Sequence, residues 1–179
     1  MRKLIVQELV SLDGFFAGSN GEIDWHHVDD EYDEYAKGFL NSVDLLLFGR
    51  VTYHLMENFW PTATNDIAYK MNTLPKIVFS TKLEKVQWQN TRLIKENIVE
   101  EVKQLKQLPG KDMAILGSAD LASYLMNAGL VDEFQITIVP VVLGNGKPLF
   151  KDIHDRVGMK LLRSKMFKSG NVLLYYEPL

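Results

Sequence analysis

Short apolar runs that alternate with segments of helical periodicity restrict the fold of this chain more than any other feature. The run Asp44–Gly49 is apolar along nearly its whole length, which is typical of an interior strand of a parallel sheet. Further strands are predicted at 3–10, 76–80, 91–95, 112–116 and 134–139, and helices at 29–43, 51–59, 64–72, 97–108 and 118–128. The chain then ends in a hairpin with strands at 159–167 and 172–176. This order predicts an α/β fold whose mixed, mostly parallel sheet is flanked by helices and carries a C-terminal antiparallel hairpin.

The composition is that of one globular domain spanning residues 1–179. A hydrophobic share of 46% and a charged share of 24% are ordinary for such a domain. The net charge of −3, without a basic face, argues against a nucleic-acid partner. The chain has no cysteine, which excludes disulfides and thiolate chemistry and fits a reducing cytoplasm. No stretch approaches the roughly 20 apolar residues of a membrane span, so we expect a cytoplasmic protein without membrane contact.

A candidate phosphate-binding turn lies where the strand at 112–116 passes into a helix. The strand ends at Gly117-Ser118, the helix begins with Ala119 and Leu121, and Gly129 ends it. Such a turn directs unpaired backbone N–H groups and the positive end of the helix dipole at one point. A phosphate bound at that point would be stabilised by both.

Two more turns of this kind follow the strands at 44–49 and 76–80. In the first, Gly49 allows close backbone approach, Arg50 offers a planar cationic fork, and Thr52 suits a helix cap or a phosphate bond. In the second, Ser80, Thr81 and Lys82 supply two hydroxyls and a cation, as a ribose 2′-phosphate requires.

The three turns are informative because they occur together. Taken singly, Arg50 equally suits a surface ion pair, and Thr52 and Ser118 equally suit helix caps. The carboxyl ends of parallel strands meet at one edge of a sheet, so all three turns should open on the same edge. Their combination favours a dinucleotide ligand.

Several sequence segments resemble the dihydrofolate reductase-like superfamily, and most closely the RibD C-terminal reductase domain of riboflavin biosynthesis. The resemblance covers nearly the whole chain, and the block 117–150 is its most specific part. The shared residues are Ser11–Gly14 with Ala17, Gly21-Glu22 with Trp25, Gly49–Thr52, Gly117-Ser118 with Leu121, and Gly129–Glu133 with Pro140, Leu143-Gly144 and Gly146.

This resemblance implies a dihydrofolate reductase-like three-layer α/β/α fold and an NADPH-dependent oxidoreductase. The implied reaction transfers a hydride to a small pyrimidine- or pteridine-like heterocycle, forming a CH–OH or CH–NH group, as in a 5-amino-6-(5-phosphoribosylamino)uracil reductase. It also implies a homodimer that pairs through 134–150. The implied cofactor-binding residues are Gly49, Arg50, Thr52, Gly117, Ser118, Ala119 and Leu121 at the pyrophosphate, Ser80, Thr81 and Lys82 at the 2′-phosphate, and Ala17 and Trp25 near the nicotinamide.

The chain departs from the riboflavin-pathway reductases where those enzymes hold the substrate phosphate. Ile23 replaces a serine, and Phe39 or Leu40 stands where an arginine is usual. The segment 57–61 replaces an Asp-Asp-Pro motif, and Leu116 replaces the glutamate of a Glu-Gly-Gly turn. Each change removes a polar contact, so the acceptor stays open. A dihydrofolate reductase proper and a non-catalytic NADPH-binding module are the alternatives.

A reductase also needs a source for the proton that accompanies the hydride. The candidates are Asp13, Asp29 and Asp30, and the last two cannot be ranked from the sequence. Each also has a structural interpretation, because Asp-Gly forms turns and acidic residues favour the first turn of a helix. His26 and His27 lie at adjacent loop positions that face opposite ways, so we expect no metal site.

Smaller features give local predictions. Asn97 followed by Glu100 resembles a capping box. Lys103, Lys106 and Lys111 indicate a solvated helix face. In the helix at 118–128, the apolar face should consist of Leu121, Tyr124, Leu125 and Ala128.

Overall fold

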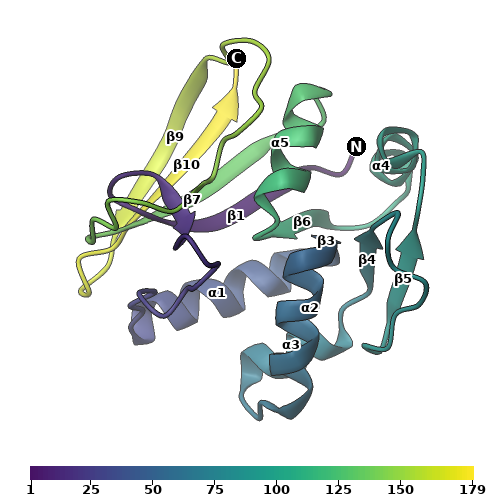
Figure 1. Cartoon of the computed structure of the whole chain (residues 1–179), viewed down its shortest axis with the longest axis horizontal. Helices are drawn as coiled ribbons and strands as arrows, with labels where there is room; N and C mark the ends of the chain where they lie inside the picture. The colour runs from purple at the N-terminus through teal and green to yellow at the C-terminus, as the bar shows by residue number, and fades with distance from the viewer.

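An eight-stranded mixed sheet organises the protein (Figure 1), as seen in a computed structural model that describes residues 1–179. Its strand order is β5-β4-β3-β6-β1-β7-β10-β9, and a second sheet pairs β2 with β8. The strands are β1 (Leu4–Ser11), β2 (Phe15–Ala17), β3 (Val43–Gly49), β4 (Lys76–Phe79), β5 (Thr91–Ile94), β6 (Asp112–Leu116), β7 (Glu133–Val139), β8 (Lys147–Pro148), β9 (Met159–Met166) and β10 (Val172–Pro178). The helices are α1 (Asp30–Ser42), α2 (Arg50–Phe59), the 3-10 turn η1 (Trp60–Thr62), α3 (Asp66–Thr73), α4 (Ile98–Gln107) and α5 (Ala119–Asn127).

The helices cover both faces of the large sheet, so the predicted α/β fold is confirmed. One core joins α4 and α5 to the sheet, through side chains such as Val102 and Leu125. A second core, on the other face, holds Phe39 of α1, Tyr53 of α2 and Met71 of α3. Figure 1 shows these two helical layers above and below the strands. No helix combines the length and the apolar character that a membrane crossing requires.

The pairing of the strands decides where a ligand site can form. Strands β3 to β7 and β1 run parallel, while β10 and β9 add the predicted antiparallel hairpin beyond β7. Strand β1 pairs with β6 only from Leu4 to Gln7, but with β7 as far as Ser11. The chain of β6 therefore leaves the sheet while β1 continues, which opens a crevice at the carboxyl edge.

Three local predictions were wrong. Asn97 is the N-cap of α4, but it has a left-handed backbone (φ +56°) and its side chain makes no capping bond. Thr52 does not cap α2, since the cap position is Gly49. Tyr124 and Ala128 are exposed, and Ala122 joins Leu121 and Leu125 on the buried face of α5.

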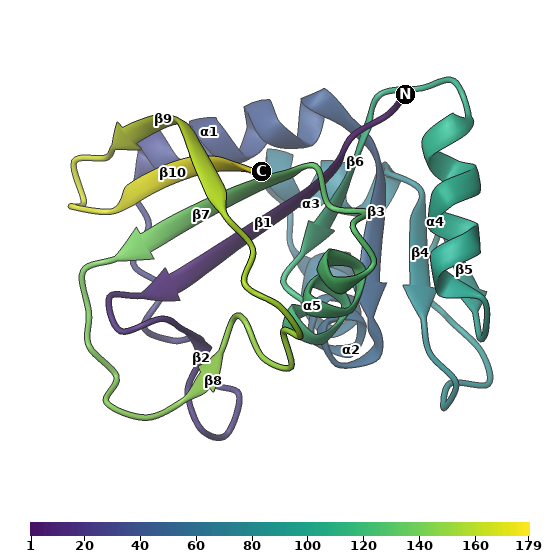
Figure 2. The same ribbon diagram turned by 90° about the horizontal axis from the view of Figure 1, so that it is seen from above.

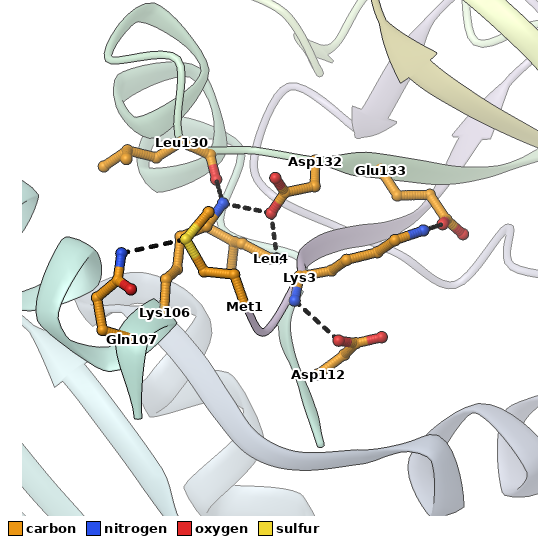
Figure 3. A network of polar contacts seen from close by, with 9 residues as sticks. All are labelled: Met1, Lys3, Leu4, Lys106, Gln107, Asp112, Leu130, Asp132 and Glu133. Carbon is orange, nitrogen blue, oxygen red and sulfur yellow. Dashed lines mark hydrogen bonds and ion pairs between the residues drawn. The ribbon is translucent and has the colours of Figure 1, made fainter. Parts of the chain in front are cut away.

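The prediction that Lys106 is solvated was also wrong. Its Nζ donates a hydrogen bond of 2.9 Å to the carbonyl oxygen of Leu130 and forms an ion pair with the Asp132 carboxylate (Figure 3). The same carboxylate accepts from the backbone N–H of Leu4, at 2.7 Å. These contacts tie α4 to the amino ends of β1 and β7, at the edge opposite the crevice. The helical pattern could not reveal this, because the partners come from distant parts of the chain.

Candidate nucleotide-binding cleft

A cleft of about 610 Å³ opens at the carboxyl edge of the sheet. Residues at the beginnings of α2 and α5 and residues of β2 and β8 line it. Figure 2 shows α2, α5, β2 and β8 toward the end of the molecule at which β1, β4 and β7 point. Such a volume falls within the range of small-molecule and cofactor sites, roughly 300–1,000 Å³. The lining residues are Phe16, Gly49, Arg50, Val51, Thr52, Phe79, Ile98, Ser118, Ala119, Asp120, Leu121, Tyr124, Gly146, Lys147, Pro148 and Lys151.

Two of the three predicted turns are locked together in the wall of this cleft. Strands β3 and β6 are neighbours, so the turns that follow them meet. The backbone N–H of Gly49 donates a hydrogen bond to Oγ of Ser118, with 2.8 Å between the nitrogen and the oxygen. Ser118 occupies the N-cap position of α5, but its side chain makes no capping bond there. Its hydroxyl instead links the two turns. Both Gly117 and Ser118 have φ of +62°, in the left-handed region, which turns the chain sharply from β6 into α5.

The two helices begin at the cleft without side-chain caps. Gly49 before α2 has no side chain, and the Ser118 side chain before α5 accepts no hydrogen bond from the first turn of its helix. The first backbone N–H groups of each helix therefore have no helical partner, and the positive dipole ends lie at the cleft. This arrangement suits two neighbouring phosphate groups.

Cations from separate elements surround these helix beginnings. Arg50 lines the cleft and takes part in no ion pair, so the alternative of a surface salt bridge is wrong. Lys147 of β8 and Lys151 also line the cleft, and Lys151 pairs at 2.7 Å with Asp120 of α5. The sequence analysis did not identify either lysine, although Lys147 directly follows Gly146 in the block 117–150.

The third turn shares this edge but not the lining of the cleft. It follows β4, which is parallel and adjacent to β3, so the prediction of a common edge is confirmed for all three turns. Phe79 reaches the cleft, whereas 80–82 lie beyond it. The Ser80 hydroxyl accepts bonds of 3.1 Å from the backbone N–H groups of Lys82 and Leu83. Thr81 and Lys82 are exposed at the rim.

The residues expected near a nicotinamide lie outside the lining as well. Ala17 is buried in β2 opposite Lys147, and its neighbour Phe16 contributes the side chain that enters the cleft. Trp25 donates from Nε1 to the carbonyl of Glu22, at 3.2 Å. Its ring lies edge-on to His26.

None of the three predicted acids reaches the cleft. Asp13 accepts hydrogen bonds from the Ser11 hydroxyl and from the backbone N–H groups of Leu143 and Gly144. The bond from Ser11 is the main reason why the pKa of Asp13 is lowered. Asp29 caps α1 by accepting from the N–H of Tyr32, which likewise lowers its pKa.

Asp30, the third acid, is exposed on the first turn of α1. The structure therefore brings the phosphate-binding turns together and leaves these three acids apart from them.

Glu8 is the acid that sequence reasoning missed. It is buried in β1 at the crevice where β6 leaves the sheet, and burial raises its pKa to about 8. The sequence held a signal, because a carboxylate interrupts a mostly apolar central strand. Burial of a charged group without a partner is costly, so such a residue often has a function.

Comparisons with known proteins find a matching family. The sequence model of the RibD C-terminal domain family matches residues 2–173. The uncharacterized protein YyaP of Bacillus subtilis is 39% identical over 181 residues, covering 98% of this chain and 95% of YyaP.

Solved structures share the fold at low sequence identity. A candidate riboflavin biosynthesis protein from Shewanella sp. PV-4 superimposes with a TM-score of 0.80 at 22% identity, covering 99% of each chain. Dihydrofolate reductase from Enterococcus faecalis, solved as a complex with NADP(H), gives a TM-score of 0.68 at 15% identity, covering 98% of this chain and 96% of that one. The expected dihydrofolate reductase-like architecture is thereby confirmed.

Proposed function

The chain belongs to the RibD C-terminal domain family, and on this premise we propose that it is an NADPH-dependent reductase of a small heterocycle. The observation that carries the proposal is the convergence of two uncapped helix beginnings and Arg50 on one cleft. Backbone N–H groups, helix dipoles and a guanidinium are the groups that bind a pyrophosphate.

The residues present fit a dinucleotide. The N–H groups at the beginnings of α2 and α5 would hold the two phosphates, with Arg50 as the cationic partner. Phe16 and Tyr124 offer apolar surface for the rings. Thr81 and Lys82, exposed at the rim beyond Phe79, would take the 2′-phosphate that distinguishes NADPH from NADH. When bound, NADPH would supply the hydride.

The heterocyclic acceptor is proposed to lack a ribosyl phosphate. Phe39 and Leu40, at the position where related reductases carry an arginine, are both buried in the core beneath the sheet. Leu116 is buried there too. None of the three can donate a hydrogen bond to a phosphate. The reduction of a C=N or C=O bond in an unphosphorylated ring is therefore the reaction that we favour.

Binding and turnover can be measured separately. Quenching of tryptophan fluorescence should show NADPH binding at least tenfold more tightly than NADH, as expected for a charge-assisted contact to the 2′-phosphate. Equal weak binding of both would overturn the assignment of 80–82. Oxidation of NADPH should then be followed with dihydrofolate, with the phosphoribosylated pyrimidine and with its dephosphorylated form, of which the last should react fastest.

One observation favours a second function, a nucleotide-binding module without catalysis. The acids Asp13, Asp29 and Asp30 all lie away from the cleft. NADPH that binds tightly but is oxidised with none of the three acceptors would support this module.

A further inference from the structure

Glu8 carries a buried oxygen atom that has no partner. Its side chain lies on the α5 face of the sheet, on the same side of β1 as Val6 and Val10. Oε1 accepts from the N–H of Leu9 at 3.2 Å, whereas Oε2 makes no hydrogen bond. Nearly all buried polar atoms in proteins are paired, so this exception requires an explanation.

The unpaired oxygen lies next to the wall of the nucleotide cleft. A Cβ atom built on Gly117 would lie 3.6 Å from Oε2 of Glu8 and 3.5 Å from Oγ1 of Thr52. Thr52 lines the cleft, and Gly117 belongs to the turn that opens into it. The Thr52 methyl carbon lies closer still, at 3.1 Å, so two oxygen atoms and one methyl group border the place where a side chain at position 117 would begin.

We infer that Glu8 binds the nucleotide as a protonated acid, donating from Oε2–H to an oxygen atom of the ligand that lies across Gly117. The inference rests on the proposed function, because it takes NADPH as the ligand. An ionised carboxylate would repel an anionic ligand at this place, while a neutral carboxyl group has one donor to offer. Thr52 Oγ1 can share the same ligand oxygen or its neighbour.

The surroundings of Glu8 keep it protonated at neutral pH. Burial raises its pKa to about 8, and the bond from the Leu9 N–H opposes this only in part. No neighbouring charge contributes to this shift, although Glu8 itself helps to raise the pKa of Tyr32 on α1. The neutral form therefore depends on the fold itself and not on one neighbouring charge.

The test is the pH dependence of NADPH affinity, measured by tryptophan fluorescence quenching without any acceptor. The 2′-phosphate loses its second proton near pH 6, so it does not titrate between pH 7 and pH 9. If NADPH binds only when Glu8 is protonated, the Kd of the unmodified protein for NADPH should rise about tenfold from pH 7 to pH 9, because the protonated fraction falls.

Three variants separate the role of Glu8 from other effects. Glu8→Gln keeps a donor that cannot ionise, so its Kd should stay constant from pH 7 to pH 9. Glu8→Leu removes the donor and should bind about fivefold more weakly than Glu8→Gln at both pH values. Glu133→Gln alters another buried carboxylate of the sheet, one that pairs with Lys3 at the opposite edge, and should keep the pH dependence of the unmodified protein.

Each outcome decides between the claims. A flat pH profile in the unmodified protein overturns the role of Glu8 and leaves the proposed function standing. Equal affinities of Glu8→Leu and Glu8→Gln overturn the hydrogen bond. Failure of NADPH to bind at any pH overturns the proposed function and, with it, this inference.

Discussion

Replacing Glu8 by glutamine should make the free protein more stable at neutral pH. The carboxyl group is buried without a partner for Oε2, and its pKa rises from 4.5 to about 8 on folding. Between these two values the unfolded chain ionises at this position and the folded chain does not. The unfolded state is therefore stabilised increasingly as the pH rises, and the native protein loses stability over that interval.

The size of the effect follows from the interval. The value pH 7 lies about 2.5 units above the pKa of this carboxyl group in the unfolded chain, and each unit corresponds to roughly 1.4 kcal/mol of stability. Glutamine has a similar shape and never ionises, so Glu8→Gln should raise the free energy of unfolding by ~3 kcal/mol at pH 7. At pH 5, only about half a pH unit above the pKa of the unfolded chain's carboxyl group, the gain falls to ~1 kcal/mol. In a chain of this length, ~3 kcal/mol corresponds to a Tm increase of about 6–12 °C.

Urea denaturation at pH 5 and pH 7 measures both values. Glu133→Gln is the matched control, because its carboxylate accepts bonds from Lys3 and Gln135 and should be stabilising. That variant should lose stability or stay unchanged. Our account of Glu8 would be refuted if Glu8→Gln were no more stable than the unmodified protein at pH 7, or if its advantage did not shrink at pH 5.

Three further substitutions test other parts of the structure. Arg50→Ala should weaken NADPH binding by about 1.5–3 kcal/mol in fluorescence titrations, the value of a charge-assisted hydrogen bond, and unchanged affinity would show that Arg50 is only a surface residue. Lys106→Met should cost about 3 kcal/mol in urea denaturation because it leaves Asp132 without its cation, whereas Lys103→Met, on the exposed side of the same helix, should cost less than about 0.5 kcal/mol. Equal losses would contradict the buried pair. Gly117→Ala should destabilise more than Gly129→Ala, since both have left-handed φ but only the first places a Cβ 3.1 Å from Thr52, and the reverse order would argue against that packing.

Local patterns in the sequence determined most of the fold. Apolar runs such as 44–49 are too short and too continuous for helices, and they became the central strands. Small residues after these runs marked the turns at 49, 80 and 117, and parallel pairing then placed all three at one edge. These features depend on residues that are close in the chain, which is why a sequence reveals them.

Only the tertiary structure decided which polar groups are available to a ligand. Asp13 and Asp29 are bonded to backbone N–H groups of segments more than a hundred residues away, so they hold loops in place. Lys106 found its partners in the same way. Glu8 Oε2 is buried without a partner, at the place where β6 ends one residue short while β1 continues. Burial and hydrogen bonding are properties of the assembled fold, and no local pattern encodes them.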